Sequence, residues 1–232
     1  MRPISIAIPS YNRYEMTVES FAKVLDVEEV TEVVIIDDCS TDGSYEKLVE
    51  HFKNEPKVKI YRNETNLDCY RNKREAIEKC TGDWVILLDS DNVIDFGYLY
   101  SLFQILDWRK DTAYMPSFAA PTFSYQQFEG LLVTKGNVAK WMDEPMFTTM
   151  LNCMNYFVNR NEYLRVWDGS VNPHTADSIF QNYNWLNGDN KIHIVSGLKY
   201  QHRIHGQSHY ILNNHKTGDF YNEVEQKIRQ LL

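Results

Sequence analysis

The segment of the sequence that most constrains the fold is residues 85–92, which read VILLDSDN. Four consecutive apolar residues are typical of a strand that is buried on both faces, as in the middle of a parallel sheet. Two carboxylates, Asp89 and Asp91, follow this strand with one residue between them. Because burying such acids without a positively charged partner is costly, we expect a cation at this end of the strand.

The first hundred residues alternate between patterns typical of strands and patterns typical of helices. Short runs rich in β-branched residues predict strands at 4–8, 33–36, 58–61 and 84–88. Apolar residues near helical spacing predict helices at 16–25, 45–52 and 73–80. Strands that alternate with helices imply right-handed βαβ units. The predicted fold is therefore α/β, with a mostly parallel central sheet flanked by helices.

In a sheet of this kind, ligands bind beyond the carboxyl ends of the strands, where Tyr11, Asp38, Asp89 and Asp91 are expected. No G-x-G-x-x-G follows the first strand and no G-x-x-x-x-G-K-[ST] occurs in the chain, which argues against a dinucleotide site and a P-loop. A bound phosphate would then need another source of positive charge. Mg²⁺ or Mn²⁺ held by Asp91 would supply it, because both ions favour oxygen ligands and phosphates.

Three stretches of the chain resemble motifs of family 2 glycosyltransferases with the GT-A fold. They are residues 8–13 (IPSYNR), residues 36–44 (IDDCSTDGS), and residues 81–84 (TGDW) running into 88–91 (LDSD). A lone D-x-D is a weak signal, but three motifs in this order are specific. The resemblance covers the first half clearly and the second half more loosely. It implies one GT-A-like domain over residues 1–232, in which 1–92 bind a nucleotide-sugar and 93–232 bind the acceptor.

The resemblance also implies a reaction, the inverting transfer of a sugar from a nucleotide-diphosphate sugar to a hydroxyl acceptor. The donor is most often a UDP-sugar, and the acceptor is a glycan or another hydroxyl compound. Pro9 and Tyr11 would lie against the base, and Asp38 would bind the uracil edge. Asp89, with its neighbour Ser90, would approach the ribose.

The metal and one donor segment follow from the same resemblance. Asp91 would coordinate the metal on the diphosphate, with Mn²⁺ preferred to Mg²⁺ if a histidine is also a ligand. Family members often have Asn, then Gly, then Arg-Asn before the metal-binding strand. Here Asn66 fits this pattern, Asp68 stands where Gly is usual, and Lys73-Arg74 stand where Arg-Asn is usual. A cation is kept for the donor at Lys73, without the planar fork of a guanidinium.

The candidate catalytic base lies in the second half of the chain. Family members often have Glu-Asp where this chain has Ala176-Asp177, so the resemblance makes Asp177 the candidate base and Asp168 the runner-up. Asp177 would otherwise only stabilise the first turn of a helix. The change at Ala176 favours an alternative function, a catalytically silent scaffold of the same fold that binds nucleotide-sugars or carbohydrates. A nucleotidyltransferase is a weaker alternative, because no glycine-rich loop follows the first strand.

Three histidines within eight residues follow the strand-like residues 192–195. Several GT-A enzymes are similar in taking a histidine metal ligand from such a segment, which favours His202, with His205 and His209 as alternatives. Arg203 and His205 would also close over the diphosphate as a flexible loop.

The aromatic residues and the end of the chain each have more than one interpretation. Residues 118–128, with Trp141, Trp167 and Trp185, would either stack on sugar rings or pack in the core. Residues 220–232 form an amphipathic helix in the prediction, with packing on the domain as the default and a partner or a membrane surface as alternatives.

Composition limits the remaining partners. The net charge is −8, from 24 Lys and Arg against 32 Asp and Glu, which argues against a nucleic-acid partner and leaves at most peripheral membrane contact. No signal peptide and no run of about 20 apolar residues is evident. The four cysteines lack metal or CxxC spacing, so a reducing, cytoplasmic location is expected.

Overall fold

The computed structural model describes residues 2–206, 208 and 218–232. Its strands in chain order are β1 (Ile4–Ser10), β2 (Val30–Asp37), β3 (Val58–Arg62), β4 (Trp84–Leu87), β5 (Thr112–Ala120), β6 (Phe123–Ser124), β7 (Leu132–Val133), β8 (Phe157–Asn159) and β9 (Lys191–Gln201). Its α-helices are α1 (Tyr14–Phe21), α2 (Ser44–His51), α3 (Asp68–Lys79), α4 (Phe96–Phe103), α5 (Phe147–Leu151), α6 (Arg160–Val166), α7 (Asp177–Asn187) and α9 (Gly218–Arg229). Single 3₁₀ turns lie at η1 (Gln126–Phe128), η2 (Val138–Trp141) and η3 (His174–Ala176).

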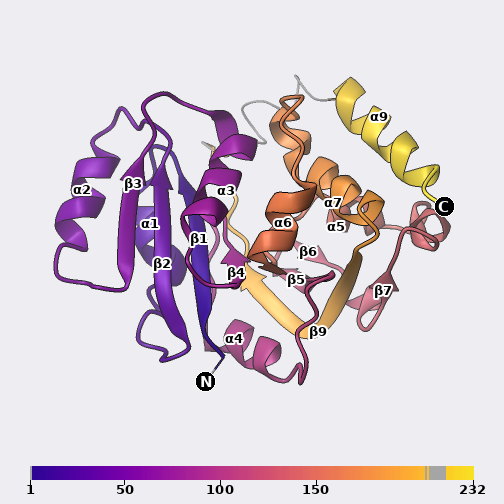
Figure 1. Ribbon diagram of the computed structural model, residues 1–232, viewed down its shortest axis with the longest axis horizontal. Helices are drawn as coiled ribbons and strands as arrows, with labels where there is room; N and C mark the ends of the chain where they lie inside the picture. The colour runs from indigo at the N-terminus through magenta and orange to yellow at the C-terminus, as the bar shows by residue number, and fades with distance from the viewer. Residues whose placement is uncertain (1, 207, 209–217) are drawn as a thin grey trace.

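One sheet runs through both halves of the described chain, in the order β3-β2-β1-β4-β8-β5-β9-β7, with β6 beside β5. Helices cover both faces of it: α3 and α6 lie toward the viewer in Figure 1, and α1 lies on the opposite face. The first four strands pair in parallel, as do β5 and β9, whereas β8 is antiparallel to both β4 and β5. The predicted α/β fold with a mostly parallel central sheet is confirmed.

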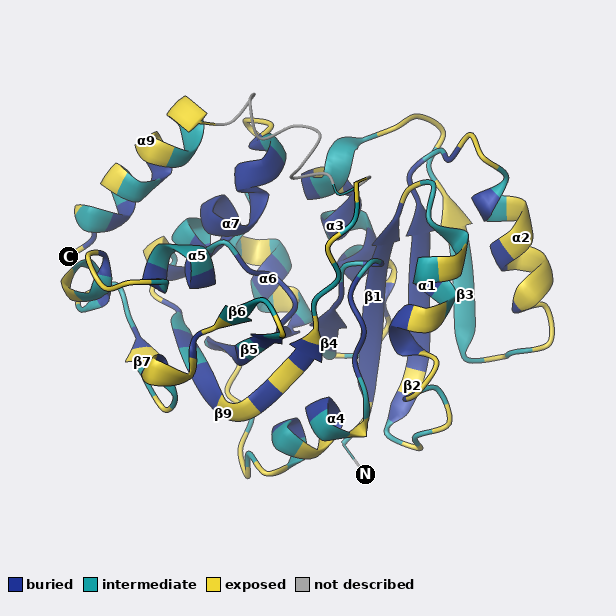
Figure 2. Ribbon diagram, turned by 180° about the vertical axis from the view of Figure 1, so that it is seen from behind, coloured by how far each residue is buried: buried dark blue, intermediate teal, exposed yellow. Residues whose placement is uncertain are grey.

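The core lies along the middle of the sheet, where the sequence has its continuous apolar runs. All seven residues of β1 are buried, and Figure 2 shows β1 and β4 as dark blue ribbons between the helices. Val85, Ile86 and Leu87 of β4 are fully buried, as expected for a strand covered on both faces. Because β1 pairs in parallel with both β2 and β4, the carboxyl ends of these three strands lie together at one edge of the sheet.

Two helices differ from the prediction. The first helix ends at Phe21 instead of residue 25, and residues 22–26 form turns in which the amide of Val24 donates to the carbonyl of Phe21. The third helix begins at Asp68 instead of residue 73, and the Asp68 carboxylate accepts from the amide of Cys69 at 2.7 Å. Side-chain acceptors at a helix start satisfy free amides, which explains why a polar stretch continues the helix toward its N-terminus.

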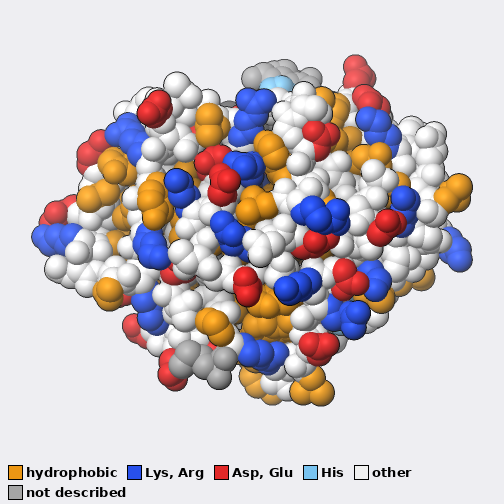
Figure 3. All heavy atoms as spheres, in the orientation of Figure 1, with side chains coloured by type: hydrophobic (Ala, Val, Ile, Leu, Met, Phe, Trp, Pro, Cys, Tyr) orange, Lys and Arg blue, Asp and Glu red, His pale blue; other side chains and the backbone are white. Residues whose placement is uncertain are grey.

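The C-terminal helix packs on the domain, which confirms the default prediction. Val224 and Ile228 of α9 are fully buried, and α9 contacts α7, with Phe180 and Phe220 meeting edge to face. The helix spans Gly218–Arg229 instead of residues 220–232. Among the described residues, every helix is too short or too polar to cross a bilayer. On the face shown in Figure 3, acidic and basic side chains are interspersed, without a continuous basic field.

Candidate active site

A cleft of about 1050 Å³ opens at the carboxyl ends of β1, β2 and β4, and residues from both halves of the chain line it. Eleven of the residues that the sequence predicted for the site line this cleft: Pro9, Tyr11, Asp38, Asn66, Lys73, Asp89, Ser90, Asp91, Asp177, His202 and Arg203. His205 contacts Asp91 from beside it. The sheet thus brings donor, metal and base candidates to one place.

The loop after β1 is held against the loop after β2. The amide of Asn12 donates to the hydroxyl of Ser40 at 2.8 Å, and the Asn12 side chain accepts from the amide of Thr41 at 2.9 Å. Asn12 has φ of 52°, a left-handed conformation that asparagine tolerates better than most residues. This loop presents Tyr11 with 43% of its surface exposed at the rim of the cleft.

Asp38 is oriented by the segment that follows β3. Its carboxylate accepts from the amide of Leu67 and from the Asn63 side chain, each at 2.8 Å. The Asn66 side chain donates to the Asp38 carbonyl at 3.1 Å. Burial raises the pKa of Asp38, and the hydrogen bonds from Leu67 and Asn63 partly offset that rise. The carboxylate is therefore positioned before any ligand binds.

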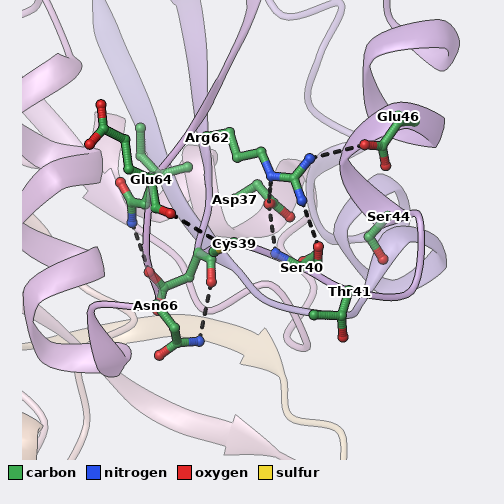
Figure 4. A network of polar contacts seen from close by, with 12 residues as sticks. Asp37, Cys39, Ser40, Thr41, Ser44, Glu46, Arg62, Glu64 and Asn66 are labelled. Carbon is green, nitrogen blue, oxygen red and sulfur yellow. Dashed lines mark hydrogen bonds and ion pairs between the residues drawn. The ribbon is translucent and has the colours of Figure 1, made fainter.

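The neighbouring acid, Asp37, has a structural role that separates it from Asp38 (Figure 4). Arg62 lies 3.6 Å from the Asp37 carboxylate and 3.0 Å from Glu46, and it donates to the Ser40 carbonyl at 2.8 Å. Asp37 also accepts from the amide of Ser40 at 2.9 Å. One arginine from β3 thus neutralises Asp37 and fixes the loop, which leaves Asp38 to line the cleft.

Lys73 connects the two walls of the cleft. Its ammonium lies 3.0 Å from Asp89 and 2.8 Å from Asp177, and its side chain is 7% exposed. Burial alone would lower the pKa of Lys73, but the charges of Asp177 and Asp89 raise it well above its ordinary value. Burial alone would raise the pKa of Asp89, but Lys73 lowers it. The cation expected beside the Asp89 carboxylate is therefore Lys73.

Asp91 is paired with different cations. Its Oδ2 lies 2.9 Å from Arg13 and 3.0 Å from Nε2 of His205, with which it forms a hydrogen bond. The structure brings His205, and not His202, into contact with Asp91, because the chain after β9 turns back toward the loop that carries the acids. His209, the other alternative, lies outside the described residues.

The residues around Asp91 include side-chain groups that a metal ion could bind. Nδ1 of His202 and Nδ1 of His205 are buried and have no hydrogen-bond partner within the described chain. Burial lowers the pKa of His202, although the charges of Asp91 and Asp89 oppose this, so its imidazole is neutral and has a free lone pair. Within the described residues no three His, Cys, Asp or Glu side chains already form a metal cluster. A carboxylate with imidazole nitrogens beside it fits Mn²⁺ as a partial ligand set.

Arg203 links the loop that carries Asp89 and Asp91 to α1. Its guanidinium pairs with Glu19 at 2.6 Å, donates to the Met16 carbonyl at 2.9 Å and bonds to the Asp91 carbonyl. The predicted contact between Arg203 and a donor remains a prediction, since these protein groups occupy much of the guanidinium.

Sequence reasoning missed three residues that shape the site. Arg13 pairs with Asp91, and its position inside the first motif was a usable signal. Asn155 donates to the Asp89 carboxylate at 3.1 Å and accepts from the Asp89 amide at 2.8 Å, with no signal in the sequence. Asp68 has φ of 69°, which explains why glycine suits this position, and its carboxylate contacts His174 at 3.1 Å.

The second-half wall of the cleft is aromatic and polar. Phe123, Tyr125 and Tyr221 line it, so the predicted aromatic segment does reach the site. By contrast, Trp185 is 1% exposed and Trp167 stacks on a buried tyrosine at 5.3 Å, which is ordinary core packing. Asp168, the runner-up base, is not among the residues that line the cleft; it accepts from the amide of Ser170 in a turn.

The family of the chain follows from comparison with known proteins. The sequence model of the family described as Glycosyl transferase family 2 matches residues 5–167. The chain belongs to glycosyl transferase family 2.

Two bacterial proteins named as glycosyltransferases are among the relatives of similar sequence. TuaG of Bacillus subtilis, named as a glycosyltransferase of teichuronic acid biosynthesis, is 32% identical over 90 residues, which cover 38% of this chain and 36% of TuaG. The poly(ribitol-phosphate) beta-N-acetylglucosaminyltransferase TarS of Staphylococcus aureus is 33% identical over 99 residues, which cover 41% of this chain and 17% of TarS. The chain spans about a third or less of the length of these two relatives.

Solved structures of family members share the fold. S. aureus TarS in complex with UDP-GlcNAc has a TM-score of 0.74 at 18% identity, covering 97% of this chain and 65% of that chain. Mannosyltransferase PcManGT from Pyrobaculum calidifontis, in complex with GDP-Man and Mn²⁺, has a TM-score of 0.65 at 12% identity, covering 100% of this chain and 70% of that chain. At these identities the likeness establishes the fold alone, and that fold is the predicted GT-A fold.

Proposed function

We propose that this family 2 chain transfers a sugar from a UDP-sugar to a hydroxyl acceptor, with inversion at the anomeric carbon. One observation carries the proposal: a single cleft joins Asp38, Asp89 and Asp91 at the strand ends to Asp177 on the opposite wall. In this proposal Asp38 binds the nucleobase, Asp89 the ribose and Asp91 the metal on the diphosphate. Asp177 accepts the proton of the acceptor. The complexes of TarS with UDP-GlcNAc and of PcManGT with GDP-Man support a nucleotide-sugar as the donor class.

The donor would lie along the first-half wall. Tyr11, at the exposed rim beside Pro9, stacks on the base, and the prepositioned Asp38 accepts from the uracil edge. Asp89, beside Ser90, accepts from the ribose hydroxyls. Asn66 supports this wall through its hydrogen bond to the Asp38 backbone.

Mn²⁺, or Mg²⁺ in its place, would be held by Asp91 with His205 or His202, whose buried nitrogens have no other partner in the described chain. Such an ion supplies positive charge beside the leaving diphosphate. Arg13 contributes a further positive charge at Asp91. No glycine-rich loop serves this purpose in the chain.

The chemical step assigns the proton to Asp177. The acceptor oxygen forms a bond to the anomeric carbon while the bond from that carbon to the diphosphate oxygen breaks, so UDP leaves with the electron pair. The acceptor proton passes to the carboxylate of Asp177, a residue that lines the cleft and whose side chain is 8% exposed. Attack opposite the leaving group inverts the anomeric centre, and the cleft adds the advantage of holding both substrates.

The test compares Asp177→Asn with the wild-type protein for UDP release from UDP-GlcNAc and other UDP-sugars in the presence of Mn²⁺. We expect release coupled to transfer to fall by about 10²–10⁴-fold, the usual contribution of a positioned base. Calorimetric UDP binding should stay within a few-fold, because the variant keeps the donor wall. Asp168→Asn, in an exposed turn away from the cleft, is the matched control and should behave as wild type.

Two outcomes would contradict parts of the proposal. Equal rates in Asp177→Asn and wild type would move the base to another acid. Tight UDP binding by wild type without release from any nucleotide-sugar would favour the catalytically silent scaffold instead.

A further inference from the structure

Lys73 joins two carboxylates that belong to different parts of the proposed reaction. It lies on α3, and it contacts Asp89 after β4 and Asp177 at the start of α7. The Lys73 and Asp177 side chains are 7% and 8% exposed, so water screens this pair little. Asp89 is more open, at 29%. One buried ammonium thus serves both the ribose candidate and the base candidate.

The surroundings leave Asp177 dependent on Lys73. The ionisable groups that interact with this pair include Cys69, Tyr70, Asp89, Cys153, Tyr156 and Tyr163. Burial raises the pKa of the two cysteines and of the three tyrosines, so these five groups are neutral at physiological pH, and Asp89 is an anion. Among these groups and the pair itself, Lys73 alone is positively charged. A buried carboxylate beside a second carboxylate needs such a partner to offset the cost of its burial.

We propose that Lys73 is a positioning residue for catalysis, which holds the carboxylate of the base Asp177 aimed at the cleft instead of binding the donor itself. This inference rests on the proposed function, and it changes the role that the sequence indicated for Lys73. The ammonium is already shared between Asp89 and Asp177. It therefore acts through the base, and donor affinity depends on it only weakly.

The experiment compares Lys73→Met, which keeps the length of the side chain and removes its charge, with Lys73→Arg, which keeps the charge. Lys79→Met, at the exposed end of the same helix, is the control. UDP affinity is measured by calorimetry, and UDP release from the UDP-sugar that wild type turns over best is measured from pH 5 to 9.

We expect Lys73→Met to lower kcat by about 10²-fold at pH 7 and to move the acidic limb of the pH profile up by about one pH unit or more, because the base loses its cation. UDP affinity should stay within about threefold of wild type. Lys73→Arg should recover at least tenfold of the lost rate, and Lys73→Met should have no further effect in an Asp177→Asn background. A tenfold loss of UDP affinity with an unmoved pH profile would overturn the inference and return Lys73 to the donor.

If wild type turns over no donor, that result refutes the proposed function alone. A measurement of stability then still decides whether Lys73 and Asp177 are coupled. Lys73→Met leaves the buried Asp177 carboxylate and the more open Asp89 carboxylate without their cation, so adding Asp177→Asn should raise its midpoint of urea unfolding at pH 8. The same double variant provides folded protein if Lys73→Met alone does not fold. If Asp177→Asn does not restore stability to Lys73→Met, the two residues are not coupled and the inference is wrong.

Discussion

Glu32→Gln should destabilise the fold by about 2–3 kcal/mol at pH 7, and by progressively less as the pH falls. Glu32 lies on β2 and is 3% exposed. Its Oε1 accepts from the Ser5 hydroxyl at 2.7 Å and from the amides of Thr81 and Gly82 at 2.5 and 3.1 Å. Its Oε2 accepts from Lys59 at 2.7 Å. One carboxylate thus ties β1, β2 and β3 to the turn before β4.

The magnitude follows from the pKa of this carboxyl. Burial alone would raise it, but the hydrogen bonds from Lys59, Ser5 and Thr81 lower the pKa of Glu32 from 4.5 to about 2. At about 1.36 kcal/mol for each pKa unit, this difference corresponds to roughly 3.4 kcal/mol of stability. We expect somewhat less, because the Lys59 side chain is 40% exposed and water screens its charge.

The sign of the pH dependence is fixed by the direction of the pKa change. Because the folded-state pKa lies below that of the unfolded chain, the stabilisation is fully present above pH 4.5 and is lost as the pH falls toward 2. On the same arithmetic, about 1.4 kcal/mol remains at pH 3. The deficit of Glu32→Gln relative to wild type should therefore shrink by more than half between pH 7 and pH 3.

Urea unfolding at pH 7, 4.5 and 3, followed by circular dichroism, measures this deficit. Glu28→Gln, an exposed carboxylate just before the same strand, is the matched control and should change stability by less than about 0.5 kcal/mol. A deficit for Glu32→Gln below 0.5 kcal/mol at pH 7, or one that does not change with pH, would refute the reasoning.

The remaining predictions concern packing and the metal. Gly82→Ala should cost about 1–3 kcal/mol in urea unfolding, because a Cβ there would lie 2.5 Å from the Ser5 hydroxyl; an unchanged midpoint would show that Ser5 moves aside freely. His205→Ala should weaken Mn²⁺-dependent UDP binding in calorimetry more than His202→Ala, because His205 contacts Asp91 at 3.0 Å. The opposite order would favour His202, the ligand indicated by the sequence.

The first half of the fold was predictable because β1, β2 and β4 are mostly buried and so contain apolar runs, whereas β3 at the edge of the sheet is only partly buried and was indicated by its β-branched residues. The second half was harder. Pro116 interrupts the pattern of β5, and the structure tolerates it through a register shift against β9 between Pro116 and Phe118. Helix α4 was not predicted, because its apolar residues are spread around the whole helix instead of along one face. Two of them, Phe96 and Tyr100, remain exposed.

The site was predictable where it depends on the sheet and not where it depends on loops. Parallel strands end at one edge, so Asp38, Asp89 and Asp91 were expected to meet. The ion pair of Lys73 with Asp177 joins residues 104 positions apart, and no local pattern signals it. The contact of His205 with Asp91 depends on the path of the chain after β9, which histidine spacing alone does not specify.

The most direct test of the account is a calorimetric titration of the protein with UDP in Mn²⁺ and again in EDTA, for wild type and for Asp91→Ala. We predict binding by wild type in Mn²⁺ that weakens at least tenfold in EDTA, and a loss of this metal dependence in Asp91→Ala with the fold intact. UDP affinity that is unchanged by EDTA in wild type would contradict the metal site. No UDP binding in either condition would contradict the central claim that the cleft binds a nucleotide-sugar.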